Sequence, residues 1–582
     1  MEIEVIDKIE GLLPYISEWQ AILKEIDNDN IFLEPDWIML RLKYLTGRCK
    51  LFILIIISDK KVAGICPLMV TDRGVCNEIS FIGSRESSNN DFILREKYRE
   101  EALGCILNFL RGLKGIYIIK LSMLAAKSAN LILMKVYLKA GKVPQAVDTI
   151  VHYIISLQGK EFNAYYESKF GKNTRHTMKK KEKRLNDLGV LTYKRISSAE
   201  IDRMFMVHDK RWLRKIGNSS FSKGDTKEFY KELALNNNTR FMATVDAITL
   251  NSKIISFIYG FEYNGRVLLI RIAHDDDFYF LSPGELVWKK KIEESFLLNA
   301  RVIDFGPGYE PYKVKWANEC EEIFTVIFPS DNLQSKLIFY IKYWSCIKLI
   351  SAIKKNKRIY NFRKYYLGKL KYLFSRENIC DNVKKVKKSV EQYGLSGYIA
   401  KKITDYISAI YSHRTYLILS KYLRGTKISE GNLRVREATI DDLEILTEVM
   451  NKSSSDIIRR FTDKHECYIT THNNELIHYC WINCGRIKIS GVDLNLPLGN
   501  LDVCIYDTFL KRNYVTENNC RYILSCILNL LYRENYKRCY VAIDCRDNSP
   551  ESEIYKEKSR PAYKVIEKVL FGRIKHNAIK LS

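Results

Sequence analysis

Apolar and polar positions along the first 330 residues follow helix and strand spacings in an order that occurs twice. Apolar residues at 12–26 recur every three or four positions, which predicts an amphipathic helix, and Pro35 fits the first turn of a second helix. Two apolar runs then flank a polar turn and predict a hairpin. The pattern continues with helices at 97–114 and 130–140 and with strands at 51–57, 62–68, 116–123 and 150–157.

A similar succession returns after residue 160. Basic helices run to residue 188, and further helices are predicted at 203–214, 226–235 and 285–298, with strands at 240–246, 253–263, 266–273 and 301–305. Two α/β units of similar size and element order indicate a duplicated fold, with a first half at 1–157 and a second at 158–330.

The rest of the chain changes character. Residues 331–430 have no clear strand pattern and predict a basic helical linker, in which Tyr340, Trp344, Ile347 and Leu349 stand among Lys and Arg. These apolar residues either lie in a membrane interface beside anionic lipid or pack on their own domain. Residues 431–582 again begin with a strand leading into a helix. The predicted class is therefore mixed α/β (α+β): tandem sheets flanked by helices, and a third such domain after the linker.

Length, charge and cysteine content limit the number of domains, the kinds of partner and the cellular compartment. A chain of 582 residues is too long for one core, and 94 Lys plus Arg against 68 Asp plus Glu give a net charge of +26. Such a charge suits nucleic acid, phospholipid headgroups or a phosphate-bearing ligand, but it is equally typical of a well-solvated basic surface. The 15 Cys form no CxxC pair, and the start of the chain does not resemble a secretory signal, so we expect a cytoplasmic protein. The apolar runs are too short to span a bilayer.

The stretch from 265 to 316 carries the most chemical information. Ser282 is placed to cap a helix, Pro283 fits the first helical position, and Glu285 completes a capping-box spacing. The free N–H groups of such a helix start, at Gly284 and beyond, can bind a pyrophosphate, although Glu285 opposes an anion. Arg271, in the preceding strand, is a further candidate to bind a cofactor that carries such a pyrophosphate. The alternative is that the turn is only a good helix start.

The same stretch has an "SPG" turn, a "DF" strand and a "G-x-E-x-Y-K-x-x-W" loop. It resembles the cellulose-biosynthesis-type acetyltransferases, a branch of the GNAT superfamily related to the Fem-type peptidoglycan aminoacyltransferases. The resemblance covers about residues 15–328, and it implies two GNAT-like halves, with an acyl-CoA or other acyl donor in the second and an acceptor amine or hydroxyl in the cleft. The residues that carry it are Ser282–Gly284, Asp304, Phe305, Gly308, Glu310, Tyr312, Lys313 and Trp316, and upstream Phe32, Pro35, Trp37, Pro67, Leu68, 175–184, His208, Arg211 and Trp212.

Acyl transfer needs a positioned thioester, an oxyanion donor and a base for the attacking group. The loop after the strand of Asp304 supplies candidates: Glu310 as base, Tyr312 as proton donor to the thiolate, and Lys313 as a contact to phosphate or carbonyl. Each has a plainer alternative, in which Asp304 only caps the loop, Tyr312 belongs to the core and Lys313 is solvated. His208 is a further candidate base, or a half-buried histidine with its hydrogen bonds satisfied.

Arg175 and the lysines at 179–181 either hold a phosphorylated acceptor or form a solvated helix face. The C-terminal module also resembles a GNAT domain. Where GNAT enzymes carry a glycine-rich loop, however, it has residues 515–520 without glycine, so we do not expect it to bind coenzyme A in the usual manner. The residues that carry this second resemblance are 434–439, 441–443, 506–509, Asn548, Ser559, Tyr563, Lys568 and Phe571, with Leu570 where glycine is usual.

The leading hypothesis is an acyltransferase that uses acetyl-CoA or another acyl-CoA and acts on a small-molecule or sugar-nucleotide acceptor of the cell envelope or of a polysaccharide. A second is a Fem-like transferase that uses aminoacyl-tRNA, which the basic helices would suit. A third, from another class, is a non-catalytic scaffold at the inner face of the membrane. The sequence has no metal-ligand cluster, no P-loop and no helix-turn-helix spacing, so we expect no metal and no nucleic-acid partner other than tRNA.

Overall fold

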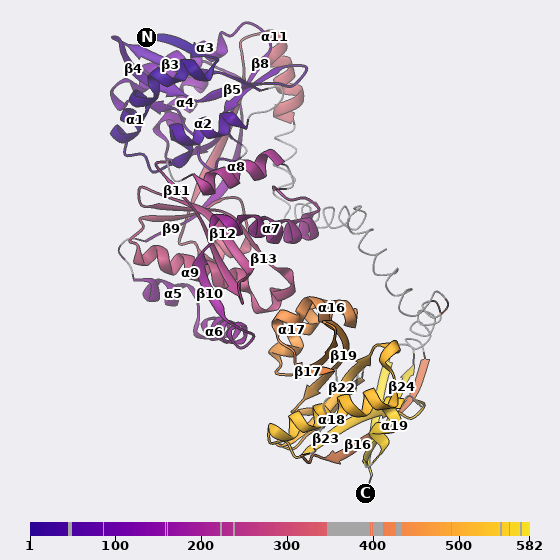
Figure 1. The fold of residues 1–582 in the computed structure, drawn as a ribbon. Helices are drawn as coiled ribbons and strands as arrows, with labels where there is room; N and C mark the ends of the chain where they lie inside the picture. Colours follow the sequence, from indigo (N-terminus) through magenta and orange to yellow (C-terminus); the bar gives the residue numbers. More distant parts are fainter. Residues whose placement is uncertain are drawn as a thin grey trace. The chain divides into compact units, whose positions relative to one another are not determined.

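The computed structural model describes most of the chain. Its Cα positions group into two compact units. The first contains Met1–Glu182, Leu191–Asp275 and Tyr279–Ser375, and the second contains Lys183–Val190, Asp276–Phe278 and Arg376–Ser582 (Figure 1). The residues described are 1–44, 49–84, 86–157, 159, 161–221, 224–236, 239–345, 396, 399, 411–425, 433–489, 492–547, 550–557, 559–570 and 573–581. Ile347, Leu349, Asn548 and Phe571, singled out above, lie outside these ranges.

The first unit contains a small antiparallel sheet of strand order β1-β3-β4-β7. The predicted hairpin is confirmed, because Leu54 of β3 pairs with Cys66 of β4. Each of the two apolar runs is nevertheless divided between two sheets, since β2 and β5 on either side belong to a larger sheet. Pro67 lies at one of the divisions, where its missing N–H suits a strand end. The bounds are β1 Glu2–Ile6, β2 Cys49–Leu51, β3 Ile53–Ser58, β4 Lys61–Cys66, β5 Leu68–Asp72 and β7 Ile93–Leu94.

A mixed sheet of eleven strands forms the centre of the first unit, in the order β10-β11-β12-β13-β14-β9-β15-β8-β6-β5-β2. Strand β15 belongs to the predicted second half and lies between β8 and β9 of the first, so the two predicted halves share one sheet. The remaining bounds are β6 Asn77–Phe81, β8 Tyr117–Ala125, β9 Ala146–Ser156, β10 Leu191–Arg195, β11 Met242–Leu250, β12 Lys253–Tyr263, β13 Arg266–His274, β14 Val302–Pro307 and β15 Glu319–Pro329.

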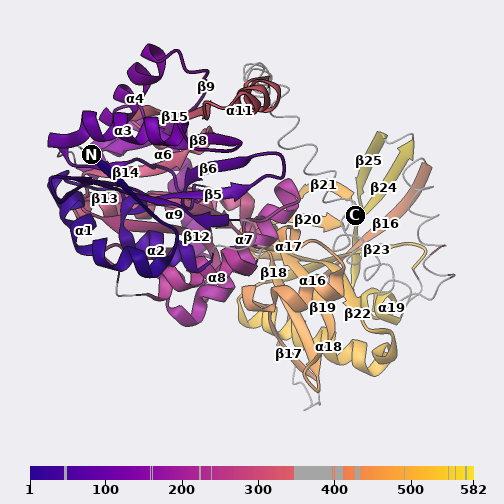
Figure 2. The same cartoon turned by 90° about the horizontal axis from the view of Figure 1, so that it is seen from above.

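The helices of the first unit flank these sheets (Figure 2), and one core cluster joins the two predicted halves. Trp37 of α2 packs edge-on against Phe229 of α8 and Phe261 of β12. The helices are η1 Ile9–Tyr15, α1 Ile16–Glu25, η2 Ile31–Leu33, α2 Pro35–Lys43, η3 Glu96–Tyr98, α3 Arg99–Arg111, α4 Ala129–Ala140, α5 Phe162–Lys169, α6 Lys172–Asn186, η4 Ser198–Glu200, α7 Ile201–Ile216, α8 Gly224–Leu235, η5 Asp276–Leu281, α9 Pro283–Leu297 and α10 Pro311–Trp316.

One βαβ pattern occurs three times among the described residues. Parallel strands β6 and β8 are connected through α3, β13 and β14 through α9, and β22 and β23 through α18. In each case the parallel pairing is short. Between β13 and β14 the pairing ends at Leu268 and Asp304, although β13 continues to His274 and β14 to Pro307. The chain thus repeats a unit in which two parallel strands are connected through a helix. The division at residues 157 and 330 stays a prediction.

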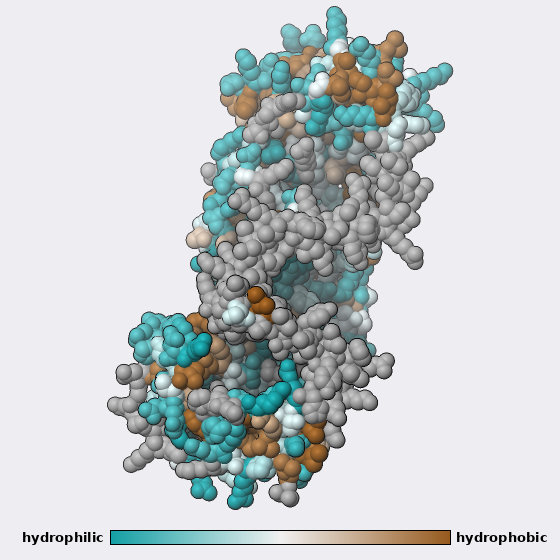
Figure 3. All heavy atoms as spheres, turned by 90° about the vertical axis from the view of Figure 1, so that its right-hand side faces the viewer, coloured by the Kyte–Doolittle hydropathy of each residue, from teal (hydrophilic) through white to brown (hydrophobic). Residues whose placement is uncertain are grey.

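After β15 the chain enters α11 (Leu333–Ile338) and the π-helix η6 (Phe339–Trp344). Phe339 is fully buried and packs with Ile118 and Ile327 in a small apolar cluster. Other apolar side chains of these two elements remain on the surface. Figure 3, seen from the right-hand side of Figure 1, shows apolar residues gathered near the upper end of the molecule, at the height of α11.

The second unit has an eight-stranded sheet of order β17-β18-β19-β22-β23-β16-β24-β25 and a two-stranded sheet of β20 and β21. The expectation that 331–430 lacks strands is wrong, because β16 lies in that segment and pairs with β23 and β24. The apolar run of β16 is short and bordered by polar residues, which hides it in the sequence. The bounds are β16 Tyr411–Tyr422, β17 Arg434–Glu437, η8 Ile440–Asp442, α16 Leu443–Met450, α17 Ser454–Thr462, β18 Glu466–His472, β19 Glu475–Asn483, β20 Arg486–Ile489, β21 Val492–Pro497, β22 Asp502–Leu510, η9 Arg512–Tyr514, α18 Glu517–Arg533, β23 Arg538–Asp544, α19 Pro550–Lys556, β24 Arg560–Leu570 and β25 Arg573–Lys580.

The predicted class is confirmed: the protein is mixed α/β, with several mixed sheets flanked by helices. In the described part of the chain, no helix is both long and apolar enough to cross a membrane.

Candidate functional site

A pocket of about 300 Å³ lies between α6 and the first two turns of α9. Ser282 and Glu285 line it at the start of α9, and Lys315 lines it from α10. The pocket therefore includes the turn that the sequence predicted as an anion site. Its other lining residues are Asn173, Thr174, Thr177, Met178, Lys181 and Glu182 of α6, with Leu281, Leu286 and Lys289.

The start of α9 differs in detail from the prediction. Pro283 occupies the first helical turn as expected, but the capping box does not form. Ser282 has a φ of 54°, in the left-handed region, and its side chain makes no cap hydrogen bond. A capping residue is normally extended, so this conformation directs the hydroxyl elsewhere. The Nζ of Lys181 donates to Ser282 Oγ at 2.7 Å, and Glu285 forms an ion pair with Lys315 at 2.7 Å.

Gly284 is buried in the first turn of α9, where it leaves room for His274 at the end of β13. A Cβ atom on Gly284 would lie 2.7 Å from Nδ1 of His274. The imidazole also contacts the guanidinium of Arg211 on α7. Burial and the charges of Arg211 and Lys215 lower the pKa of His274 to about 3, so the ring is neutral near pH 7. The glycine is thus explained by helix-strand packing, independently of any ligand.

The electrostatics of the pocket favour an anion despite two carboxylates. Lys181, Lys289 and Lys315 line it, against Glu182 and Glu285. Lys289 pairs with Glu182 at 3.4 Å, while Lys315 neutralises Glu285, whose charge would otherwise repel an anion at the helix start. The partial positive charge of the helix N-terminus adds to the remaining cation. This arrangement can bind a phosphate or pyrophosphate group.

Asp304 is buried inside an ion-pair network at the point where β13 and β14 cease to pair. Its carboxylate contacts His152 of β9, accepts from Arg266 Nη1 at 3.0 Å, and accepts from the N–H of Gly306 at 2.7 Å. Burial alone would raise the pKa of this carboxyl, but His152 and Arg266 hold it at about 2. The bond to Gly306 fits the loop-capping alternative, and the other contacts occupy both oxygens. A catalytic role for Asp304 stays a prediction.

The loop after β14 brings the other predicted residues together. Glu310 is the N-cap of α10, and the Tyr312 ring lies 5.2 Å from that of Trp288 on α9. Lys313 is buried, so the solvated alternative is wrong. Its Nζ donates to the carbonyls of Gly306 and Pro307 at 3.1 and 3.0 Å, and it thereby closes the loop on itself. Glu310 and Tyr312 are both half-buried.

Of the residues predicted for catalysis or cofactor binding, only Ser282 lines the pocket. His208 and Arg271 make contacts elsewhere in the first unit. His208 is buried on α7, where Nδ1 bonds Ser219 Oγ at 2.8 Å and burial lowers the pKa of the imidazole. It is thus fully buried and not half-buried as the plainer alternative had it, and a catalytic role for it stays a prediction. Arg271 lies with its guanidinium 5.4 Å from the ring of Tyr230 on α8. Its assignment to the same cofactor site as Ser282–Gly284 stays a prediction that the pocket lining does not support.

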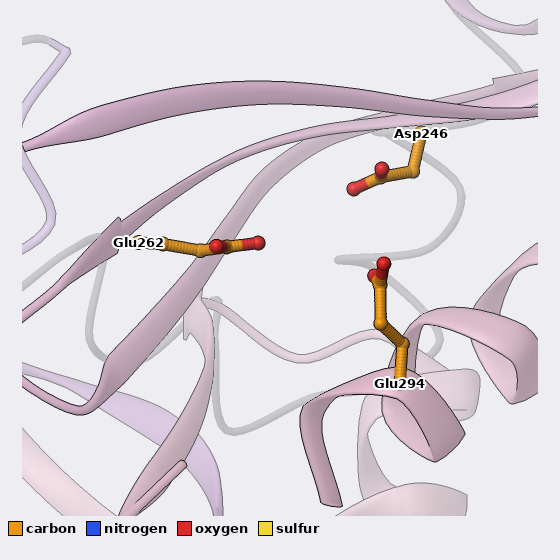
Figure 4. Close-up of side chains that lie close together, drawn as sticks. All are labelled: Asp246, Glu262 and Glu294. Atoms are coloured by element: carbon orange, nitrogen blue, oxygen red, sulfur yellow. The ribbon is translucent and has the colours of Figure 1, made fainter. Parts of the chain in front are cut away.

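Three carboxylates of the first unit lie close enough to share a cation. Oxygen atoms of Asp246, Glu262 and Glu294 are within 4.8 Å of one another (Figure 4). The buried Lys291 already lies among them, with Nζ at 2.7 Å from Asp246, 2.7 Å from Glu262 and 2.9 Å from Glu294. Arg195 adds a second positive charge, at 3.2 Å from Asp246. The cluster is thus a compensated ion network, and it gives no reason to invoke a metal.

In the second unit a small cavity lies beside the corresponding helix, α18. The small cavity beside α18 has a volume of about 10 Å³ and is lined largely by apolar side chains. Thr516 caps α18 by accepting from the N–H of Asn519. The expectation that this module does not bind coenzyme A in the usual manner stays a prediction.

Sequence reasoning missed several residues that shape the candidate site. Lys289 follows Glu285 by four positions, a spacing that places both on one helix face, but a lone lysine gives little signal. Lys315 stands in the recognised loop and was not singled out. His152 lies on a strand distant in sequence, and nothing local to it indicates that it contacts Asp304.

A family model matches the segment that carries all but one of the pocket-lining residues. Residues 172–314 match the family model of an acetyltransferase (GNAT) domain. No curated protein matches the chain in sequence. Among solved structures, FemX is 12% identical over 59% of this chain and 100% of its own, with a TM-score of 0.42.

Two further structures have similarly low scores. The C-terminal domain of a putative lysylphosphatidylglycerol synthetase from Agrobacterium fabrum is 10% identical over 56% of this chain and 96% of its own, with a TM-score of 0.35. A tandem GNAT protein from the clavulanic acid biosynthesis pathway is 9% identical over 56% of this chain and 98% of its own, with a TM-score of 0.34.

Proposed function

We propose, from the premise that residues 172–314 form a GNAT acetyltransferase domain, that the protein is an acyl-CoA-dependent acyltransferase. Its acceptor is the amine or hydroxyl of a small-molecule or sugar-nucleotide precursor of the cell envelope or of a polysaccharide. The observation that carries the proposal is the pocket at the start of α9, where Lys181, Lys289 and Lys315 surround a helix N-terminus. That chemistry suits the pyrophosphate of coenzyme A. The sugar part rests on the resemblance to cellulose-biosynthesis-type acetyltransferases.

The reaction requires one bond to form and one to break. The acceptor nitrogen or oxygen attacks the thioester carbonyl carbon, the new C–N or C–O bond forms, and the C–S bond breaks. The acceptor loses a proton to a base, and the departing thiolate takes a proton from an acid. We assign the base to Glu310 and the acid to Tyr312, because both are half-buried in the segment after β14. Glu310 is the N-cap of α10, and Tyr312 lies on α10 with its ring against Trp288 of α9.

Asp304, Lys313 and His208 fit supporting roles better than proton transfer. The carboxylate of Asp304 is occupied by His152, Arg266 and the N–H of Gly306. Lys313 contacts two backbone carbonyls of the loop that carries Glu310 and Tyr312. Both are therefore positioning residues of that loop. His208 keeps helix α7 in place through Ser219.

The test is a titration of the purified chain with acetyl-CoA and with coenzyme A by calorimetry, followed by assay of thiol release with a panel of amino sugars and sugar nucleotides. Tyr312→Phe should lower kcat and leave KM for acetyl-CoA near the wild-type value, because the hydroxyl acts only on the departing thiolate. Tyr309→Phe, an exposed tyrosine of the same loop, is the matched control and should keep wild-type turnover. Full activity of Tyr312→Phe would refute the assigned acid.

A second candidate is transfer from aminoacyl-tRNA, as in the Fem-type enzymes to which the recognised family is related. The basic helix α6 favours it, because it borders the pocket and carries Arg175 and the lysines at 179–181. Arg175 pairs with Glu167, so it is not reserved for a ligand. Saturable binding of aminoacyl-tRNA without binding of coenzyme A would select this candidate. Binding of neither would favour the non-catalytic scaffold.

A further inference from the structure

The outer face of α11 and η6 carries an apolar stripe. Leu333 is 82% exposed, Leu337 61%, Tyr340 47% and Ile341 67%. Their spacing of four, three and one positions places them on one side of a helix. The other side is buried through Ser335 and Phe339. We call the four exposed residues the α11 stripe.

Such a stripe differs from the scattered apolar residues that any surface carries. Its members are consecutive along one helical face, and the segment rests on the sheet through the opposite face, where Phe339 packs with Ile118 and Ile327. The apolar stripe therefore keeps its position without a partner. Contiguous exposed apolar groups on a folded surface typically mark a contact with another molecule or with a membrane.

Charge identifies the kind of partner. Lys336 and Lys342 lie within the same two elements. From residue 333 to residue 376 the sequence has 12 Lys and Arg and not one Asp or Glu, so almost half of the net charge of +26 lies in this stretch. Exposed leucine and isoleucine together with Lys and Arg are the composition of a segment that lies on an anionic lipid surface.

We propose that α11 and η6 dock on an anionic phospholipid surface, with the α11 stripe inserted at the boundary between headgroups and acyl chains. Tyr340 suits that boundary, because its ring is apolar and its hydroxyl polar. An RNA partner would use the positive charge but leave the exposed Leu333, Leu337 and Ile341 without a role. A second copy of the chain would bring two strongly basic segments together. The proposal is independent of the acyltransferase function.

The test uses the full chain and vesicles of two compositions, phosphatidylcholine alone and phosphatidylcholine with phosphatidylglycerol. In flotation, the wild type should rise with the anionic vesicles and not with the neutral ones. Leu337→Glu combined with Ile341→Glu should lower the partition coefficient by on the order of ten-fold or more, because both side chains lose their apolar contact and gain repulsion. Raised salt should weaken the binding of the wild type.

Leu297→Glu is the matched control, since Leu297 is 77% exposed outside the stripe. It should bind vesicles as the wild type does, and all variants should keep the wild-type melting temperature. Equal binding by the stripe variant and the control would overturn the proposal. Failure of the wild type to bind anionic vesicles would also overturn it. Three further results would then name the partner of the stripe: binding to tRNA indicates RNA, a dimer that the stripe variant abolishes indicates a second copy, and a loss of stability in that variant indicates that the chain itself covers the stripe.

Discussion

The Nζ of Lys181 lies 2.7 Å from the Oγ of Ser282, and this hydrogen bond joins α6 to the residue that precedes α9. The side chain of Ser282 makes no cap hydrogen bond to the helix. The pocket between the two helices is thus partly built by a lysine 101 residues earlier in the chain. The first prediction concerns the other lysines around it.

Lys289→Ala should weaken the binding of coenzyme A by roughly ten-fold or more, because a charge-assisted hydrogen bond to phosphate contributes about 1.5–3 kcal/mol. Lys290→Ala is the control. Both lysines contact Glu182, at 3.4 and 3.9 Å, but only Lys289 lines the pocket. Calorimetric titration of both variants measures the difference. The same loss of affinity in both would mean that the effect is a general loss of positive charge, and the phosphates would then bind elsewhere.

Gly284→Ala should lower the free energy of unfolding by about 1–3 kcal/mol, since the new methyl group meets the imidazole of His274 in a packed interior. The cost should shrink in a His274→Ala background, where that space is open, and urea denaturation of the four variants of this double-mutant cycle measures it. Gly171→Ala, whose Cβ would meet nothing within 4 Å, is the control. Additive effects of the two changes would show that His274 does not limit the site.

The start of α9 also shows how much of the candidate site could be predicted from the sequence. The position of Pro283 and the helix after it follow from local chemistry, so α9 and its neighbouring strands were predicted well. The partners of Ser282 and Glu285 were predicted wrongly, because Lys181 and Lys315 reach them through tertiary structure that no local rule contains. Spacing alone favoured a capping box.

The same limit explains the larger errors. Strand β16 was assigned to a linker because strands are identified in a sequence by an apolar run, and its run is short. The strand forms because its backbone pairs with β23 and β24. The apolar runs at 51–57 and 62–68 looked like single strands, yet each is divided between two sheets. Periodicity indicates that a strand exists, whereas its partners decide where it ends.

Asp304→Asn should destabilise the protein by about 3–5 kcal/mol at neutral pH. The guanidinium of Arg266 and the imidazole of His152 would stay buried but would lose the carboxylate that each of them contacts. Asp29→Asn is the control, since Asp29 also contacts Arg266, at 3.1 Å, but is more exposed; its cost should stay within about 1 kcal/mol. Urea denaturation at neutral pH compares them. Similar losses in both would contradict the special role of the buried carboxylate.

The pH dependence of the same pair gives a further check. The folded-state pKa of Asp304 lies at about 2, below its value in the unfolded chain. Its contribution to stability is therefore fully present above about pH 4 and is lost as the pH falls from about 4 towards 2. The stability difference between wild type and Asp304→Asn should narrow over that interval. A constant difference would mean that the carboxyl titrates normally in the folded state.

Lys291→Ala should remove the cation that holds Asp246, Glu262 and Glu294 together, at a cost of about 3–5 kcal/mol. The three carboxylates, with oxygens within 4.8 Å of one another, would then surround an empty position. Oxygen ligands suit Ca²⁺ and Mn²⁺, so either ion should raise the melting temperature of this variant. The wild type, in which Nζ fills the position, should not respond. Lys290→Ala, one residue earlier, should behave as the wild type. An unresponsive Lys291→Ala variant would show that the carboxylates move apart once the ammonium is gone, and that Arg195 does not keep them together without it.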